Sequence, residues 1–260
     1  MYFIATSLSL EIASSKILTI SDCANVQAAL YNLMGACDPA ATKTLHDMQR
    51  NKCWTLSIAK SSRDATILRI TFLGEQGLFY ANLLATAASR HPNLSIGAEI
   101  ACITDINASQ NNFTTINTWA DITREKPSRY IRFVFHTPAA ITKQDEQRQK
   151  YFSLLPDPAD VFIGLERKWK GFAGPELTGN LGQFLSTGGC AITECAIHSE
   201  KFNAGDHSQV GFVGHVVYAC RKNDLDCIRS INWLSRFANF TGVGCQTARG
   251  MGATSTYLED

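Results

Sequence analysis

Strand-like and helix-like stretches occur twice in the same order along this chain. Apolar residues that alternate with polar ones predict a strand, and apolar residues spaced three or four apart predict a helix. In each half these patterns follow the order strand, helix, strand, strand, helix, strand. In the first half we predict the elements at residues 3–10, 23–34, 53–60, 66–73, 75–89 and 98–106, with a loop between the first helix and the second strand.

The second half repeats this order and has a glycine-rich segment before its last, short strand. Two consecutive βαββαβ patterns predict an α+β protein of two tandem ferredoxin-like (RRM-like) domains. A polar stretch over residues 107–127 separates them, so we predict an N-terminal domain over residues 1–122 and a C-terminal domain over residues 123–260. The other elements of the second half are predicted at residues 129–137, 158–172, 191–202, 210–220 and 223–239, with Asn223 as the N-cap of the last helix.

The composition limits how such a chain can work. Its 260 residues include 24 Lys and Arg against 23 Asp and Glu, and 45% of them are hydrophobic. This balance excludes a disordered chain and argues against a protein that binds a polyanion through its overall charge, although a local basic patch stays open. No apolar run reaches 18 residues and the N-terminus alternates without a basic start. We therefore predict a cytoplasmic protein with no membrane segment.

Nine cysteines are present, and their spacing matches neither a C-x-x-C pair nor a zinc finger. Most of them lie in apolar runs, as Cys102 and Cys220 do. This placement favours buried reduced thiols over a disulfide framework. The sequence predicts no metal site and no cofactor.

The glycine-rich segment reads GVGCQTARGMG over residues 242–252. It is not a P-loop, because it has no G-K-[ST] and follows a helix, and its spacing is not that of a Rossmann fingerprint. On composition alone, two interpretations of this segment are about equally supported. It forms either a tight turn that closes the domain or a loop whose backbone N–H groups face a phosphate.

This segment resembles the glycine-rich signature of the repeat-associated RNA-binding (RAMP) superfamily of CRISPR systems. Within it, the chain resembles the CRISPR repeat-processing endoribonucleases, through the residues from Leu45 to Ser57 and the strand RYIRFVFHTPAAI over residues 129–141. The resemblance implies tandem ferredoxin-like domains and metal-independent cleavage of precursor RNA within CRISPR repeats. It also implies that the product is retained or delivered to a CRISPR effector complex. The oligomeric state, monomer or homodimer, stays open.

Cleavage of this kind needs a base of near-neutral pKa that deprotonates a ribose 2′-OH, and a cation that stabilises the charged phosphorane. Without the resemblance, the sequence favours none of its six histidines as that base. With it, His46 matches the family's catalytic position as general base or acid, Lys52 the phosphate stabiliser, and Tyr31 a positioning or proton-donating partner. The alternatives are a packing tyrosine and a solvated lysine, with Lys43 and Arg50 as substitutes for Lys52.

RNA binding must come from local clusters, because the chain as a whole is nearly neutral. A cluster of basic residues is as often a solvated face as a binding site. We predict RNA contacts from residues in the glycine-rich segment and from basic residues of the second half: Gly242, Gly244, Gln246, Thr247, Arg249, Gly250, Gly252, Arg129, Arg132, Arg167, Lys168 and Lys170.

Two other functions compete with the nuclease. One is a non-catalytic RNA-binding subunit of a CRISPR effector complex, which would share the fold and the glycine-rich segment. The other is an unrelated tandem ferredoxin-like enzyme or small-molecule binder that uses a thiol.

Overall fold

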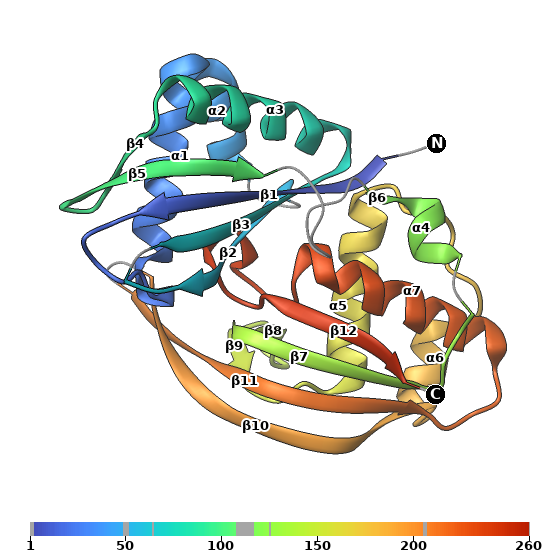
Figure 1. The fold of residues 1–260 in the computed structure, drawn as a ribbon. Coiled ribbons are helices and arrows are strands. Elements are labelled where there is room, and N and C mark those ends of the chain that lie inside the picture. Colours follow the sequence, from blue (N-terminus) through green and yellow to red (C-terminus); the bar gives the residue numbers. More distant parts are fainter. Residues whose placement is uncertain are drawn as a thin grey trace.

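A computed structural model describes residues 3–48, 52–63, 65–107, 117–124, 126–204 and 207–259. Figure 1 shows two layers of strands, one above the other. The first half forms an antiparallel sheet in the order β2-β3-β1-β5-β4, with β6 also paired to β1. Its strands are β1 (Phe3–Ala13), β2 (Trp54–Ser61), β3 (Thr66–Leu73), β4 (Asn93–Ile96), β5 (Glu99–Asn107) and β6 (Asn117–Thr118), and its helices are α1 (Cys23–Cys37), α2 (Pro39–Asp47), α3 (Gly74–Arg90) and α4 (Trp119–Thr123).

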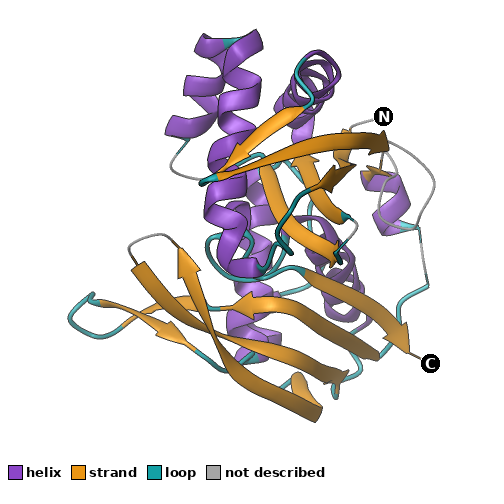
Figure 2. Cartoon of the chain, turned by 60° about the vertical axis from the view of Figure 1, so that its left-hand side comes forward, coloured by secondary structure: helices purple, strands orange, loops and turns teal. Residues whose placement is uncertain are grey.

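The second half forms an antiparallel sheet in the order β10-β11-β7-β12, beside a separate hairpin of β8 and β9. Figure 2 shows from a second side that helices pack against both layers of strands. The strands are β7 (Tyr130–Ala139), β8 (Ile141–Gln144), β9 (Lys150–Ser153), β10 (Cys190–Ala204), β11 (His207–Cys220) and β12 (Thr254–Glu259), and the helices are α5 (Pro158–Gly171), α6 (Leu181–Ser186) and α7 (Leu225–Thr241).

Both main sheets place their strands in the same relative order. Leaving out the additional strands β4 and β6, the first sheet reads second, third, first, fourth, and so does the second sheet. This is the arrangement of a βαββαβ ferredoxin-like unit. The predicted fold class is therefore confirmed, while the boundary at residue 122 stays a prediction.

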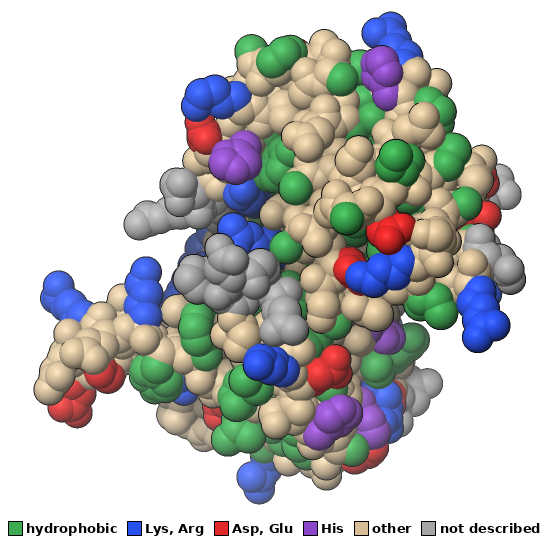
Figure 3. Space-filling view, turned by 90° about the vertical axis from the view of Figure 1, so that its left-hand side faces the viewer, with side chains coloured by type: hydrophobic (Ala, Val, Ile, Leu, Met, Phe, Trp, Pro, Cys, Tyr) green, Lys and Arg blue, Asp and Glu red, His purple; other side chains and the backbone are tan. Residues whose placement is uncertain are grey.

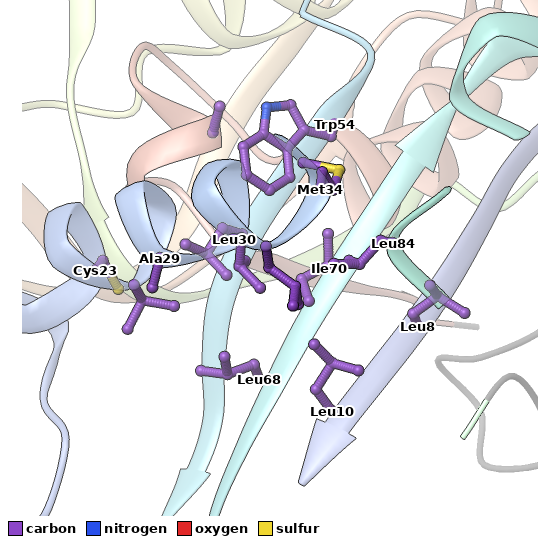
Figure 4. Close-up of a cluster of buried hydrophobic side chains, with 14 of the residues drawn as sticks. Leu8, Leu10, Cys23, Ala29, Leu30, Met34, Trp54, Leu68, Ile70 and Leu84 are labelled. Carbon is purple, nitrogen blue, oxygen red and sulfur yellow. The ribbon is translucent and has the colours of Figure 1, made fainter. Parts of the chain in front are cut away.

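The core of the first half follows from the periodicities of its sequence. Alternation in β1 and β3 turns Leu8, Leu10 and Ile70 to one face of the sheet, where α1 and α3 cover them with Leu30 and Leu84. Figure 4 shows these side chains pointing toward one another between the helix and the strands. Each of the five is less than 5% exposed, so their burial accounts for the position of α1 and α3 on the sheet.

The predicted loop after the first helix is wrong, because residues 39–47 form α2. Asp38 is its N-cap and accepts a hydrogen bond from the Ala41 amide at 2.9 Å, and Pro39 occupies the first turn. An Asp-Pro pair in this position is a helix start signal. The buried residues of this short helix are only Thr42 and Leu45, and a single apolar side chain sets no period.

Further differences from the predicted elements concern a helix cap and several short elements. The N-cap of α7 is Asp224, whose carboxylate accepts from the Cys227 amide at 3.0 Å, and not Asn223. The strands β4, β8 and β9 and the helix α6 were not predicted, because four to six residues carry too little periodicity.

The burial of the cysteines also differs in part from what the sequence predicts. Among the described residues Cys23, Cys53, Cys190, Cys220 and Cys227 are buried and free. Cys102 and Cys195 are free but exposed, because they lie on the outward-facing positions of β5 and β10. An apolar run around a cysteine in a one-sided sheet does not decide which face it occupies.

The two halves meet through the end of α7 and the glycine-rich segment. The Arg69 guanidinium in β3 donates to the Asn239 carbonyl at 2.9 Å, and the Thr55 hydroxyl in β2 donates to the Phe240 carbonyl at 3.1 Å. Burial lowers the pKa of Arg69 to about 10. Ala248 and Met251 belong to the hydrophobic core of the first half. The glycine-rich segment is thereby fixed against α1 and β2.

Candidate active site

The three residues predicted to be catalytic lie together. The Lys52 ammonium, just before β2, donates to the Tyr31 hydroxyl on α1 and to the His46 carbonyl on α2, both at 3.1 Å. The rings of Tyr31 and His46 meet edge to face with their centroids 5.3 Å apart. The structure therefore brings together side chains from three different elements.

The surroundings shift the pKa of two of these groups. Burial raises the pKa of Tyr31 to about 12, so its hydroxyl carries its proton at neutral pH. Partial burial, followed by the nearby Arg249 guanidinium, lowers the pKa of the Lys52 ammonium from its usual range. Lys52 and Arg249 are thus close enough for their charges to repel, which favours the neutral form of Lys52. A bound anion would favour the charged form instead.

His46 stands at the end of α2 with its side chain 67% exposed. Its Nδ1 lies 3.1 Å from the Asp47 carboxylate, which also pairs with Lys43. Lys43 and then His46 lower the pKa of Asp47. A carboxylate at Nδ1 favours the tautomer that leaves Nε2 available as a base. Of the two predicted substitutes for Lys52, Lys43 is paired with Asp47, and Arg50 lies outside the described residues.

A hollow of about 440 Å³ opens beside these residues, and we call it the first hollow. Its lining includes His46, Lys52, Lys168 of α5 and Arg249 of the glycine-rich segment. None of the described side chains that line it is a carboxylate. Figure 3 shows blue lysine and arginine side chains gathered in the recess between the upper and lower parts of the molecule. Three cations without a carboxylate give the first hollow a positive potential, which favours an anion over a cation.

The glycine-rich segment is a tightly folded turn whose glycines are required by its backbone. Gly242, Gly244 and Gly252 all have φ between +63° and +84°. A Cβ on Gly252 would lie 1.9 Å from the Val243 carbonyl oxygen, and one on Gly244 would lie 2.4 Å from the Ala140 carbonyl oxygen. Gly250, with φ of +98°, packs against Cys23.

Several amides of this segment are used internally. Those of Val243, Cys245 and Gly252 donate to the carbonyls of Gly252, Ala140 and Pro138 at 2.9–3.0 Å. The structural interpretation of the segment as a closing turn is therefore correct for these residues, and their N–H groups do not face a phosphate. Residues 244 and 246–249 nevertheless line the first hollow, so the turn also presents side chains to it.

Lys168 holds the end of this turn in place. Its ammonium donates to the carbonyls of Thr241 at 3.2 Å and Gly242 at 3.1 Å, at the carboxyl end of α7. Burial lowers the pKa of Lys168 to about 8. A lysine at a helix C-terminus satisfies carbonyls that have no partner within the helix.

Other residues predicted to bind RNA have protein partners away from the first hollow. Arg132 forms ion pairs with Glu194 at 3.1 Å and Glu259 at 2.5 Å, on strands of the second sheet. Arg129 hydrogen-bonds Asn223, and Lys170 pairs with Glu166 on the same helix. Arg167 is exposed on α5 and does not line the first hollow.

Sequence analysis missed several residues that line the first hollow. Gln27 on α1 donates from Nε2 to the Ala248 carbonyl at 2.8 Å and is 9% exposed. A glutamine on the apolar side of the predicted helix 23–34 was the sequence signal that could have identified it. Thr55, Met48 and Phe172 also line the hollow, and nothing in their local sequence distinguishes them.

In the described part of the chain, no three His, Cys, Asp or Glu side chains come together as metal ligands would. The same residues contain no helix with the length and hydropathy needed to cross a membrane.

The fold consists of two ferredoxin-like halves with a cationic hollow beside the glycine-rich segment. Solved structures with a similar fold include Cas6 proteins. A Cas6 product complex (TTHB231) superposes with a TM-score of 0.82 at 20% identity, over 98% of this chain and 100% of that chain. Thermus thermophilus Cas6 (TTHB231) gives 0.76 at 20% identity, over 98% and 99%. The product of a Cas6-related gene from Pyrococcus furiosus gives 0.64 at 13% identity, over 98% and 100%.

At these identities the superpositions show a shared fold. The model of the family described as CRISPR-associated endoribonuclease Cas6 matches residues 133–254. No curated protein matches the sequence. The resemblance inferred from the sequence is thus confirmed by the family model over residues 133–254, which is a little less than half of the chain.

Proposed function

We propose that this protein is a metal-independent endoribonuclease that cleaves CRISPR precursor RNA within its repeats. One observation carries the proposal: a histidine with an available Nε2 stands at the edge of a hollow that three cations line. A base beside an anion site is what 2′-OH attack on a phosphodiester requires.

In the proposed mechanism, Nε2 of His46 takes the proton of a ribose 2′-OH. The 2′ oxygen attacks the adjacent phosphorus, and the bond from phosphorus to the 5′ oxygen of the next nucleotide breaks. The products are a 2′,3′-cyclic phosphate and a 5′-OH. Lys52 and Arg249 stabilise the additional negative charge on the phosphorane.

Tyr31 has two roles in this scheme. Its ring orients His46 through their edge-to-face contact, and its hydroxyl accepts a hydrogen bond from Lys52. The hydroxyl, which is protonated at neutral pH, supplies the proton that the leaving 5′ oxygen takes up, and the tyrosinate then regains a proton from the His46 imidazolium. The cleaved repeat RNA then stays bound or passes to an effector complex.

The test is incubation of the purified protein with the repeat RNA of its own locus, in EDTA. We expect cleavage at one position in the repeat, with a 2′,3′-cyclic phosphate on one fragment and a 5′-OH on the other. A repeat with a 2′-deoxynucleotide at the cleavage position should bind and stay intact. Tight binding without cleavage of the unmodified RNA would instead identify a non-catalytic RNA-binding subunit.

A further inference from the structure

Two cysteines face each other across the ladder of β10 and β11. Cys190 is the first residue of β10 and Cys220 the last residue of β11, and the register of the strands pairs them directly. Figure 1 shows β10 and β11 running side by side. Among the described strands, no other register pair consists of two cysteines. Neither residue lines the first hollow, so the pair is a feature separate from the candidate active site.

The backbone hydrogen bonds around this pair decide how close its side chains come. The Arg221 amide donates to the Gly189 carbonyl at 2.8 Å, one residue beyond the pair on each strand. The Cys220 amide donates at 2.8 Å to the Arg129 carbonyl, just before β7, and not to Cys190. This is the pattern of a non-hydrogen-bonded pair, in which the Cα atoms are about 4.5 Å apart. Disulfides join Cα atoms that are about 4.4–6.8 Å apart, so the backbone here can accept one.

The two sulfur atoms also interact. A hydrogen bond from the Cys190 thiol lowers the pKa of Cys220 despite its burial, and the nearby Arg129 guanidinium lowers it further. The same contact raises the pKa of Cys190. Because the thiolate is the nucleophilic form of cysteine, Cys220 is the attacking sulfur of this pair and Cys190 the one that keeps its proton.

Both thiols are covered in the folded protein but lie at its edge. Cys190 is 4% exposed and Cys220 is 3% exposed. They stand at the open end of the hairpin, where Gly188 and Arg221 are exposed. The end of a ladder opens at a lower free energy than its middle. Such an opening admits a small uncharged oxidant such as hydrogen peroxide.

We propose that Cys190 and Cys220 form a disulfide when the protein meets hydrogen peroxide. The Cys220 thiolate attacks one peroxide oxygen, the O–O bond breaks, and the hydroxide that leaves takes up a proton to become water. The Cys190 sulfur then gives up its proton and attacks the sulfur of the Cys220 sulfenic acid, and the S–O bond breaks to release a second water. Two thiols are thereby oxidised to one disulfide, while one peroxide is reduced to two waters.

This disulfide would close the segment from residue 190 to residue 220, which contains most of β10 and β11. A cross-link of this kind stabilises the folded state, mainly because it restricts the unfolded chain. A thiol reductant reverses it by exchange. The second sheet would then be more resistant to unfolding under oxidising conditions. The inference goes beyond RNA cleavage and does not rest on it.

The test is a tryptic digest of the peroxide-treated protein after the remaining thiols have been blocked. Trypsin cuts after lysine and arginine, so Cys190 and Cys195 share the peptide 171–201 and Cys220 lies in the peptide 202–221. We expect these two peptides to stay joined until a reductant is added, and fragmentation of the joined peptides to place the link at Cys190. Cys190→Ser should abolish the link. Cys195→Ser should keep it and is the matched control, because Cys195 lies on the same strand and peptide but pairs with Val216.

Thermal unfolding gives a second measurement. The oxidised wild-type protein should have a Tm about 5–10 °C above that of its own reduced form, and Cys190→Ser should show no such difference. Each protein is compared with its own reduced form, so a loss of stability caused by the substitution itself does not enter. Peptides that stay separate although the exposed Cys195 has been oxidised, or a link that survives in Cys190→Ser, would overturn the proposed disulfide. Equal Tm values for the oxidised and reduced wild-type protein would overturn its stabilising effect.

Discussion

At the residue scale, hydrogen bonds to the protein fix the positions of two lysines in the candidate site. The Lys52 ammonium donates to the Tyr31 hydroxyl and the His46 carbonyl, and the Lys168 ammonium donates to two carbonyls at the end of α7. The family resemblance predicted catalytic roles for Lys52, Tyr31 and His46; the three residues lie in contact, and their roles stay a prediction. It could not predict that Lys168 reaches the same hollow from α5, because the two lysines are separated by more than a hundred residues and only the packed fold brings them together.

Lys52→Ala should lower the rate of single-turnover cleavage by on the order of 100-fold, since removal of one group that stabilises a transition-state charge has about this effect. Its effect on RNA affinity should be much smaller. Lys52→Arg should retain most of the rate, because it keeps the charge. An unchanged rate in Lys52→Ala would show that another cation stabilises the phosphorane.

The lowered pKa of Lys168 predicts that the affinity for RNA depends on pH. Its pKa is lowered to about 8, so it loses its positive charge as the pH rises through that value, earlier than an ordinary lysine. His46, Lys52 and Arg249 face the same hollow, and of these Lys52 also has a lowered pKa. RNA affinity should therefore fall above about pH 8, and Lys168→Arg should move this fall to higher pH. Identical profiles for the two proteins would contradict the assignment.

At the element scale, long periodic segments were predictable and short ones were not. β3 occupies residues 66–73 as predicted, and α3 and α5 differ from their predicted ends by one residue. α2 was missed because its two buried side chains set no period, although its Asp-Pro start was visible. The consequence for the site is direct, since α2 and not a loop presents His46 beside Asp47.

The glycine-rich segment should tolerate no side chain at Gly252. Its φ of +67° and the Val243 carbonyl oxygen 1.9 Å from a Cβ both oppose alanine. Gly252→Ala should lower the free energy of unfolding by about 1–3 kcal/mol from backbone strain alone, measured by urea unfolding. Gly164→Ala should raise it by up to about 1 kcal/mol, because this helical glycine has open space around it. A Gly252→Ala protein with the same free energy of unfolding as the wild type would contradict the described turn.

At the scale of the whole molecule, a net charge of +1 coexists with a strongly cationic hollow. The near-neutral charge of the chain predicts that RNA binding is local, and we propose that it occurs where the glycine-rich segment meets α1 and β2. The place itself could not be predicted, because it arises where residues of the second half, such as Met251, enter the core of the first half.

The salt dependence of RNA binding follows from this distribution. Three lysine and arginine side chains line the first hollow. At about −0.7 per phosphate contact with single-stranded RNA, the slope of log affinity against log salt should be about −2. A titration from low to moderate salt measures it. A slope several times steeper would show that basic residues outside the first hollow carry most of the binding.

The central claim is that His46 is the base of an RNA-cleaving site. The most direct measurement is single-turnover cleavage of the repeat RNA by His46→Ala, with RNA affinity measured in parallel and His91→Ala as the control histidine outside the hollow. We predict a rate at least about 100-fold below that of the wild-type protein with nearly unchanged affinity, as for loss of a general base. Cleavage by His46→Ala at the wild-type rate would contradict the claim.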